Sequence, residues 1–371
     1  MVPAGDRCLL LLSGAWGRRL VERRKAAAGL VQTIAAYNLA GFEPRPNQPW
    51  HDSHAQMQMT PTQETEPSSW VGGLPALPKG MPWPEIDGTP AVFRAQIDCR
   101  QLPDDLWGGM APPSGWLIFF SGADSLGDVV VRYTQQLGPL RGTASAPRWA
   151  LIPADPATQP EGSEYRLRSD TPRQALLQHD TPPLVLSPHD DTSRAMYLTA
   201  LQTALENRAH RAQEPDSPET VSAEDLAHWV ELAQTSTPDQ VDAVLDRIAQ
   251  QDHPVLAKHL RRAVTIGYLA QLERHARCIH AQAPDDLPDT VRTALEPIWQ
   301  FEADRDRLTL GGPVDLGFFY DRMKDPVCLL QIPSSSLLAW EFAGNERWGV
   351  FIPPQALQAR DFSQAWGSVS N

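Results

Sequence analysis

The sequence lacks the motifs that identify the common nucleotide-binding and hydrolytic enzymes. Its 371 residues contain no Gly-x-x-x-x-Gly-Lys phosphate loop and no Gly-x-Ser-x-Gly nucleophile elbow. No Gly-x-Gly-x-x-Gly turn follows an expected strand. The sequence therefore predicts no catalytic residue by motif, which favours a non-enzymatic role without deciding it.

Cysteine is scarce, and long apolar runs are absent. The four cysteines, at positions 8, 99, 278 and 328, never form a C-x-x-C pair, so neither a zinc ribbon nor a redox motif is indicated. The apolar run Leu9 to Leu12 is too short for a secretory signal, and Asp6 precedes it. Nothing approaches the roughly 20 apolar residues of a membrane span. We expect a cytoplasmic protein with no integral membrane segment.

Basic charge is low as well. The 32 Lys and Arg residues face 45 Asp and Glu residues, and the net charge of −13 argues against general binding to nucleic acid or to anionic membranes. The hydrophobic fraction of 42%, with 12 Trp, is typical of a globular protein. The 35 proline residues predict many rigid turns and strand edges.

The first 69 residues divide by composition into two segments. Residues 1–42 are expected to form an N-terminal helical extension with a basic cluster between Arg18 and Lys25. Residues 43–69 are rich in Pro, Gln, Thr, Met and Glu, a composition that indicates a linker. The pair His51 and His54 falls in this segment, and we expect no site there.

Residues 70–190 predict a first β-rich half. Turn-rich segments alternate with short β-branched and aromatic runs, as in an antiparallel sheet. The expected strands are Val92 to Ile97, Trp116 to Phe120, Val129 to Tyr133 and Trp149 to Ile152, with a weaker one at Leu184 to Leu186.

Residues 191–306 predict a helical insertion. Ser222-Ala-Glu-Asp225 and Thr237-Pro-Asp-Gln240 have the spacing of capping boxes, and apolar residues follow each at helical intervals. A long helix from Pro254 towards His280 and another from Val291 to Phe301 complete the insertion.

Residues 307–371 predict a second β-rich half that packs on the first. Leu310-Gly-Gly-Pro313 matches Gly72-Gly-Leu-Pro75, Leu329-Leu-Gln-Ile-Pro333 matches Phe93-Arg-Ala-Gln-Ile-Asp98, and Trp348 to Ile352 matches Trp116 to Phe120. Three short matches in the same order indicate an internal duplication. The expected fold is α+β and mainly β, with two related roll-like halves and an inserted helical block.

Several of these segments also resemble the YwqG-like family of bacterial domains of unknown function. The resemblance, over roughly residues 68–371, rests on Gly72-Gly73-Leu74-Pro75, Leu77-Pro78, Trp83-Pro84, Phe93-x-x-Gln96-Ile97-Asp98, Leu102-Pro103, Gly115-x-Leu117-x-Phe119-Phe120, Leu329-Leu-Gln-Ile332, Gly344 to Ile352 and Asp361-Phe362-Ser363. It implies a mainly β, roll-like architecture with accessory helices, and no established activity, catalytic residue or cofactor. Relatives tend to carry a Trp-Gly-Asp-type turn before the last strand, where this chain has Ala343-Gly-Asn-Glu-Arg347.

The candidate ligand-binding residues are aromatic and polar side chains in or beside the repeated segments: Trp83, Gln96, Asp98, Trp116, Gln331, Trp340 and Trp348. Aromatic side chains offer flat apolar faces for peptides or small molecules, although Trp is also an ordinary core residue. The two glutamines, at equivalent repeat positions, must be hydrogen-bonded if they are buried, and an amide that ties strands together is the simpler interpretation.

Metal binding is the main alternative. His179-Asp180 and His189-Asp190 resemble the paired ligands of metal-dependent hydrolases, but they lie in proline-rich segments. His275 and Cys278 share one face of a helix, whereas His280 lies about 140° from His275, so the three cannot bind one ion from a regular helix.

The leading functional hypothesis is a non-catalytic protein-interaction or ligand-binding module that has a protein partner and no cofactor. A metal-dependent hydrolase and a small-molecule binder in a Trp-lined cleft between the β halves remain as alternatives. The sequence leaves the partner, the ligand and the oligomeric state open.

Overall fold

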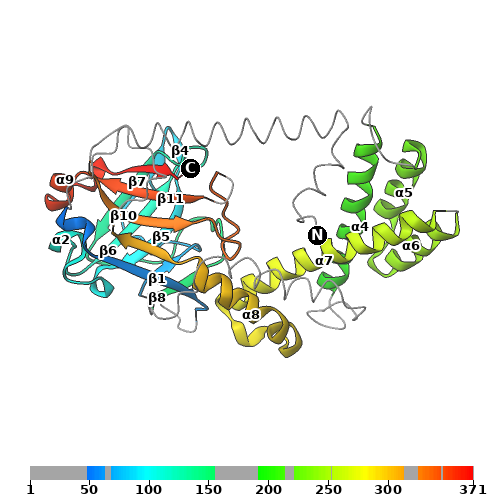
Figure 1. Cartoon of the computed structure of the whole chain (residues 1–371), viewed down its shortest axis with the longest axis horizontal. Coiled ribbons are helices and arrows are strands. Elements are labelled where there is room, and N and C mark those ends of the chain that lie inside the picture. The colour runs from blue at the N-terminus through cyan, green and yellow to red at the C-terminus, as the bar shows by residue number, and fades with distance from the viewer. Residues whose placement is uncertain are drawn as a thin grey trace, which may run out of the picture. The chain divides into compact units, whose positions relative to one another are not determined.

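The computed structural model describes residues 48–62, 68–154, 191–213, 221–251, 253–312, 325–343 and 346–370 (Figure 1). The described strands are β1 (His54–Thr60), β2 (Trp70–Val71), β3 (Glu85–Ile86), β4 (Thr89–Pro90), β5 (Val92–Asp98), β6 (Trp116–Ser121), β7 (Val129–Thr134), β8 (Trp149–Pro153), β9 (Leu308–Gly311), β10 (Val327–Pro333), β11 (Arg347–Ile352) and β12 (Trp366–Val369). The α-helices are α2 (Leu106–Gly109), α4 (Asp191–Ala212), α5 (Ala223–Thr235), α6 (Val241–Gln250), α7 (Pro254–Gln282), α8 (Asp289–Arg305) and α9 (Pro354–Gln358). Short 3₁₀ turns are η1 (Pro49–His51), η2 (Cys99–Gln101), η4 (Pro238–Gln240), η5 (Pro284–Asp286) and η6 (Phe362–Gln364).

Helices account for more of the described residues than strands do. The fold is therefore a mixture of α and β, and the expectation that it is mainly β is not confirmed. Helices outnumber strands in residues because α4 to α8 are long and the strands are short. The segment that contains α4 to α8 was expected to be helical.

One antiparallel sheet organises the β part. Its strand order is β12-β11-β10-β9-β1-β8-β2-β5-β6-β7. The order is symmetric: the consecutive strands β9 to β12 flank one side of the central β1–β8 pair, and β2, β5, β6 and β7 flank the other. The two edges of the sheet also approach each other, since the Gly367 N–H after the start of β12 donates to the Gly127 carbonyl just before β7, at 2.9 Å. The sheet is thus nearly closed.

Strand β1 corrects the prediction of a linker over residues 43–69. It lies in the middle of the sheet, between β8 and β9. Met57 and Met59 alternate with Gln56 and Gln58, and both methionines are buried. This period of two is the pattern of a strand with one face on the core, although the composition of the segment is that of a linker.

Strands β5 and β6 are buried on both faces, which explains the nearly continuous apolar sequence of β6. Leu117 and Phe119 of β6 pack in the main core, whereas Ile118 and Phe120 pack in a smaller one on the opposite face. The smaller core also contains Trp70, Leu77 and Phe93 and is bordered by Trp83.

The two β hairpins that carry the repeated sequences share local geometry. The register of β5 against β6 shifts between Phe93 and Ala95, and that of β10 against β11 shifts between Cys328 and Leu330. The inserted residues are therefore Arg94 and Leu329, each two positions before the matching glutamine. Gly72, Gly73, Gly311 and Gly312, which follow or end the preceding strands, all adopt positive φ.

The ladder pairing changes one detail of the expected repeat. Leu117 faces Ile97 across its hairpin, and Trp348 faces Ile332 across the other. Trp348 is thus the structural counterpart of Leu117 and not of Trp116. A shift of one residue moves a side chain to the other face of a strand, so the two tryptophans have different environments.

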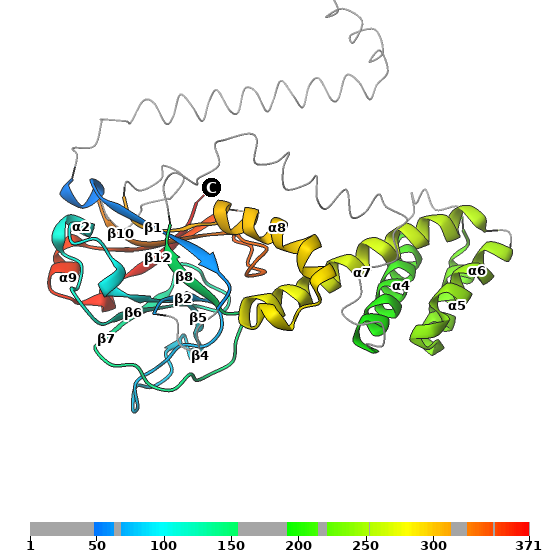
Figure 2. The same cartoon turned by 90° about the horizontal axis from the view of Figure 1, so that it is seen from below.

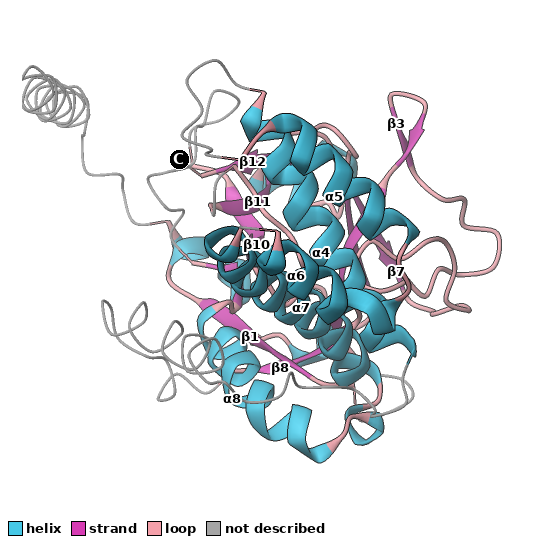
Figure 3. Cartoon of the chain, turned by 90° about the vertical axis from the view of Figure 1, so that its right-hand side faces the viewer, coloured by secondary structure: helices cyan, strands magenta, loops and turns pink. Residues whose placement is uncertain are grey.

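Helices α4 to α6 lie beside α7 (Figure 3), and together with the first part of α7 they form their own apolar cluster. The expected N-terminal caps are present: the Asp225 N–H donates to the Ser222 hydroxyl at 3.0 Å, and a reciprocal capping box links Thr237 and Gln240. Helix α7 continues from this cluster to the main core, where Ala276 and Ala281 pack and α8 follows (Figure 2). In the described part of the chain, no helix is long and apolar enough to cross a membrane.

His280, near the end of α7, makes stability depend on pH. Its ring lies between Trp149 and Trp299, with centroid distances of 6.0 and 4.7 Å, and it is 3% exposed. Burial lowers the pKa of His280 below its usual value near 6.5, with Glu296 opposing the shift and Arg292 adding to it. The folded protein therefore favours the neutral imidazole.

We expect the free energy of unfolding to fall as the pH falls below 6.5, because the unfolded chain then binds a proton that folded His280 resists. The contribution of neutral His280 to stability is fully present when the pH is above the pKa of this histidine in the unfolded chain. Urea denaturation of the wild type and of His280→Gln at pH 5.5 and 7.5 measures it. The variant, which has no group titrating at this position, should lose less stability between the two pH values; an equal loss in both proteins would contradict the prediction.

Candidate functional site

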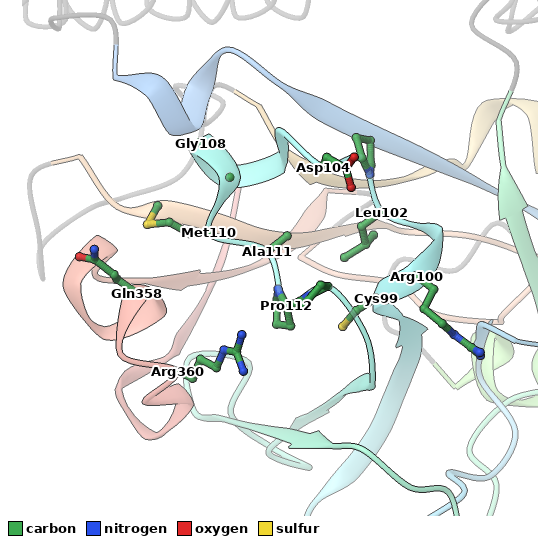
Figure 4. A pocket seen from close by; sticks show the side chains of 13 residues that line it. Cys99, Arg100, Leu102, Asp104, Gly108, Met110, Ala111, Pro112, Gln358 and Arg360 are labelled. Atoms are coloured by element: carbon green, nitrogen blue, oxygen red, sulfur yellow. The ribbon is translucent and has the colours of Figure 1, made fainter.

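A pocket of about 610 Å³ opens where the chain leaves β5 (Figure 4). It is lined by three segments, namely η2 with the residues after it, the segment around α2, and the end of α9. The lining residues are Cys99, Arg100, residues 102–104, residues 108–113, Gln358 and Arg360.

The segment around α2 is held in place by a buried tryptophan. Trp107 is fully buried, and its indole Nε1 donates to the Cys328 carbonyl of β10 at 2.8 Å. Trp107, Gly108 and Gly109 adopt φ of 55°, 68° and 78°, so the chain turns in the left-handed region just before the pocket. Glycine tolerates this conformation, whereas at Trp107 the anchoring contacts must offset the strain.

Cys99 lines the pocket but is not an activated nucleophile. Burial raises the pKa of the Cys99 thiol to about 12, and the neighbouring Asp98 carboxylate adds to the shift. The thiolate is the reactive form of cysteine, and at neutral pH this side chain is almost entirely the thiol. Cys99 therefore offers the pocket a weakly polar wall.

Asp98 and Trp116, two of the predicted ligand-binding residues, lie beside the pocket and have structural contacts of their own. The buried Asp98 carboxylate accepts from the Arg100 backbone N–H at 3.0 Å and from the Arg100 guanidinium at 2.6 Å. That guanidinium also lies 5.2 Å from the Trp116 ring centre. Arg100 also lines the pocket, but Figure 4 shows its side chain extending away from the other labelled residues, and the ion pair at 2.6 Å directs its charge to Asp98.

Arg360 provides the positive charge inside the pocket. Figure 4 shows its guanidinium directed towards Pro112 and the pocket interior. The side chain passes over the Tyr133 ring, 5.8 Å from its centre. Among the described residues Arg360 has no carboxylate partner, and its side chain is exposed.

The backbone of Arg360 ends helix α9 in an unusual way for an arginine. Its φ is 56°, its N–H donates to the Leu357 carbonyl, and the Asp361 N–H donates to the Ala356 carbonyl. This is a Schellman cap, in which glycine normally occupies the left-handed position. A residue with a Cβ costs about 1 kcal/mol more there.

The other predicted residues lie away from this pocket. Trp83 and Gln96 are on the side of the smaller core: the Trp83 indole donates to the Ala91 carbonyl at 2.9 Å, and the buried Gln96 Oε1 accepts from the Ala76 N–H at 3.0 Å. Gln96 thus ties the loop after β2 to β5. In β10, the Gln331 amide lies 3.4 Å from the Cys328 sulfur.

Trp340 and Trp348 lie together, beside Arg94 of β5. The guanidinium carbon of Arg94 is 4.7 Å from the Trp340 ring centre and 6.0 Å from that of Trp348. The seven predicted residues are therefore divided among four places, with Gln331 apart from the other six, and do not line one cleft. Arg94 and Arg360 were not among the predicted residues. A charged residue within the apolar run Val92 to Ile97 was a visible signal for Arg94, whereas no local pattern distinguishes Arg360.

The proposed metal ligands are only partly within the described residues. Described His, Cys, Asp and Glu side chains form no group of three that could hold a metal ion. His179, Asp180, His189 and Asp190 lie outside the described residues, so the hydrolase hypothesis stays a prediction. The other two histidines, His51 and His54, were not expected to form a site. His51 lies in η1, near the Pro326 carbonyl, and His54 is the first residue of β1.

Comparison with known proteins finds one family whose model covers most of the chain, from the segment before β2 to β12. The model of a domain of unknown function, DUF1963, matches residues 69–369. No curated protein matches the chain.

Proposed function

Because the chain belongs to the DUF1963 family, a domain of unknown function, we propose a role on the geometry of its own pocket: a non-catalytic protein-interaction module that binds an acidic group of a partner at Arg360. The observation that carries the proposal is a guanidinium that is directed into a pocket and has no carboxylate partner among the described residues. An arginine fork binds carboxylates with two parallel hydrogen bonds, which makes it selective for such groups.

The backbone at Arg360 supports a functional rather than a structural role. A Schellman cap needs only a residue that tolerates positive φ, and glycine does this without strain. The arginine therefore keeps helix α9 less stable than glycine would. Backbone strain of this kind clusters at functional sites, where the strained residue is kept because its side chain serves the function and not the stability of the fold.

Four of the remaining lining residues suit apolar groups that flank an acidic one, although the carboxylate of Asp104 also lines the pocket. Leu102, Met110, Ala111 and Pro112 supply apolar surface next to the charge. An aliphatic or proline side chain beside a glutamate or aspartate would cover this surface while the carboxylate pairs with Arg360. The protonated Cys99 thiol gives no support to covalent catalysis in the pocket.

Replacing Arg360 by glycine is expected to stabilise the protein and weaken its binding to an acidic partner at the same time. Unfolding should cost about 1 kcal/mol more, because the left-handed strain is relieved. Affinity for an acidic partner segment should fall by about tenfold or more, since a charge-assisted hydrogen bond is lost. Urea denaturation measures the first effect, and fluorescence anisotropy with a panel of short peptides, each carrying Glu or Gln between Leu and Pro, measures the second.

Arg360→Lys is the matched control, because it keeps the charge and the backbone strain but loses the planar fork. Its stability should equal that of the wild type, and its preference for Glu over Gln peptides should weaken without disappearing. A glycine variant that retains the full Glu preference would contradict the proposal, whatever its stability.

A small carboxylate ligand is the second candidate, and the size of the pocket favours it. Sites for small molecules commonly span about 300–1,000 Å³, and this pocket has about 610 Å³. Free glutamate and succinate in the same titration separate the two candidates. A small acid that binds as tightly as the best peptide would assign the pocket to a metabolite.

We also propose that the two β halves arose by duplication and that the chain is YwqG-like. The symmetric strand order, the paired positive-φ glycines and the bulges at Arg94 and Leu329 support the duplication. The free thiols of Cys99, Cys278 and Cys328 favour the reducing cytoplasm as its location.

A further inference from the structure

Arg94 is a buried cation without a counter-charge among the described residues. Its side chain projects from the bulge in β5, and the residue is 8% exposed. Its Nε donates to the Ser121 hydroxyl at 2.9 Å, and no acidic group pairs with it in the described part of the chain. Buried charges are normally paired, because an unpaired one loses its hydration.

The fold itself does not require a cation at this position. Leu329 occupies the corresponding bulge in the β10–β11 hairpin and is fully buried in the main core. An apolar side chain therefore satisfies the same backbone geometry. Burial lowers the pKa of Arg94 to about 10, so the guanidinium is still charged at neutral pH and its desolvation is not compensated by a carboxylate.

Aromatic rings hold the guanidinium of Arg94 in a defined orientation. Its central carbon lies 4.7 Å from the Trp340 ring centre, 5.6 Å from that of Phe342 and 6.0 Å from that of Trp348. Cation–π contacts stabilise the charge without using its N–H donors. The donors other than Nε thus remain for a ligand.

A second buried donor lies at the same place. The Trp340 Nε1 is buried and has no hydrogen-bond partner among the described residues, and Trp340 as a whole is 7% exposed. The turn that carries it is closed by two hydrogen bonds between the backbones of Ser335 and Trp340. The indole is therefore fixed in position with its donor unused, which is uncommon for a buried polar group.

We propose that Arg94 and Trp340 form a binding site for a single carboxylate group, enclosed by Phe342 and Trp348. A planar carboxylate accepts two hydrogen bonds from a guanidinium, and its second pair of acceptor sites can take the indole N–H. One cation between flat rings matches a planar monoanion better than a tetrahedral dianion. The site is independent of the pocket at Arg360, since Arg94 is near the start of β5 and that pocket lies beyond its end.

The test is anion-dependent stabilisation of the full chain. Thermal unfolding is followed in sodium acetate, sodium phosphate and sodium chloride at equal ionic strength, and acetate affinity is read from tryptophan fluorescence. The wild type should melt at a higher temperature in acetate than in chloride. Trp340→Phe keeps the ring and removes the N–H donor, and it should weaken acetate binding by about tenfold, the effect of losing one hydrogen bond to a charged group.

The matched control is Trp299→Phe, which removes another buried indole N–H that has no partner among the described residues, next to His280. Its acetate affinity should be unchanged. Arg94→Met should abolish the stabilisation by acetate. If the methionine variant does not fold, Arg94→Lys is measured instead; it keeps the charge but loses the planar pair of donors, so its acetate affinity should be lower than that of the wild type. Equal melting temperatures in acetate and chloride, stabilisation by phosphate alone, or an equal loss in Trp340→Phe and Trp299→Phe would each overturn the proposal.

Discussion

Replacing Trp348 by alanine is expected to remove most of the stability of the β part. The side chain is fully buried in the main core, and its Nε1 donates to the Leu126 carbonyl at 2.8 Å. Truncating a buried tryptophan costs about 3–5 kcal/mol. The unpaired Leu126 carbonyl and the lost contact with Arg94 add to this, so the loss is comparable with the whole stability of many domains, about 5–15 kcal/mol.

Two control variants separate the contributions to this loss. Trp348→Phe keeps a ring in the core and removes only the donor, so it should cost about 1–3 kcal/mol. Trp116→Ala removes the tryptophan that matches Trp348 in sequence, in the first β-rich half. The Trp116 side chain is only partly buried, and its Nε1 lies 3.3 Å from the Ser68 carbonyl. Urea denaturation followed by circular dichroism should place Trp348→Ala far below the other two. A loss in Trp116→Ala as large as that in Trp348→Ala would contradict the different environments of the two residues.

Replacing Gly367 by alanine is expected to separate the two edges of the sheet. A Cβ at this position would overlap the Leu126 carbonyl oxygen and would lie 2.8 Å from Cγ1 of Val129. The backbone of β12 must then move away from the chain before β7, which breaks the hydrogen bond from Gly367 to Gly127. Overpacking of this kind costs about 3 kcal/mol when the obstacle is backbone.

Gly127→Ala is the control on the other side of the same hydrogen bond. A Cβ there would meet no atom closer than 3.8 Å, so the substitution should change stability little. Hydrogen exchange resolves the two outcomes further, because only Gly367→Ala should accelerate exchange at the amides of β12 and β7. Equal exchange rates in the two variants would mean that the edges do not depend on this close approach.

Local patterns predicted the elements that carry their own signals. Strand β5 was expected at Val92 to Ile97 and extends over Val92–Asp98, and β6 was expected at Trp116 to Phe120 and extends over Trp116–Ser121. The caps at Ser222 and Thr237 are also present, since a cap depends on residues only a few positions apart. Strand β1 was missed because composition was given more weight than the alternation of Met57 and Met59.

The candidate residues were predicted with less success, because their environments depend on distant parts of the chain. Trp116 and Trp348 look equivalent in sequence, yet the ladder register places Trp348 in the core and leaves Trp116 half-buried. Arg94 was treated as part of an apolar strand. The buried, aromatic environment of Arg94 is formed only in the folded chain, where the bulge directs the side chain towards Trp340, almost 250 positions later in the sequence.

By itself the sequence determined the alternation of β segments with one helical block, the capped helix starts and the absence of the common catalytic motifs. The tertiary structure decided which strands are neighbours, and therefore that β1 lies at the centre of the sheet and that β12 returns to β7. It also decided that Arg360 faces a pocket and Arg94 faces three aromatic rings. The physical reason is that caps and periodicity depend on neighbouring residues, whereas strand pairing, burial and the pairing of charges depend on contacts between segments that only the folded chain brings together.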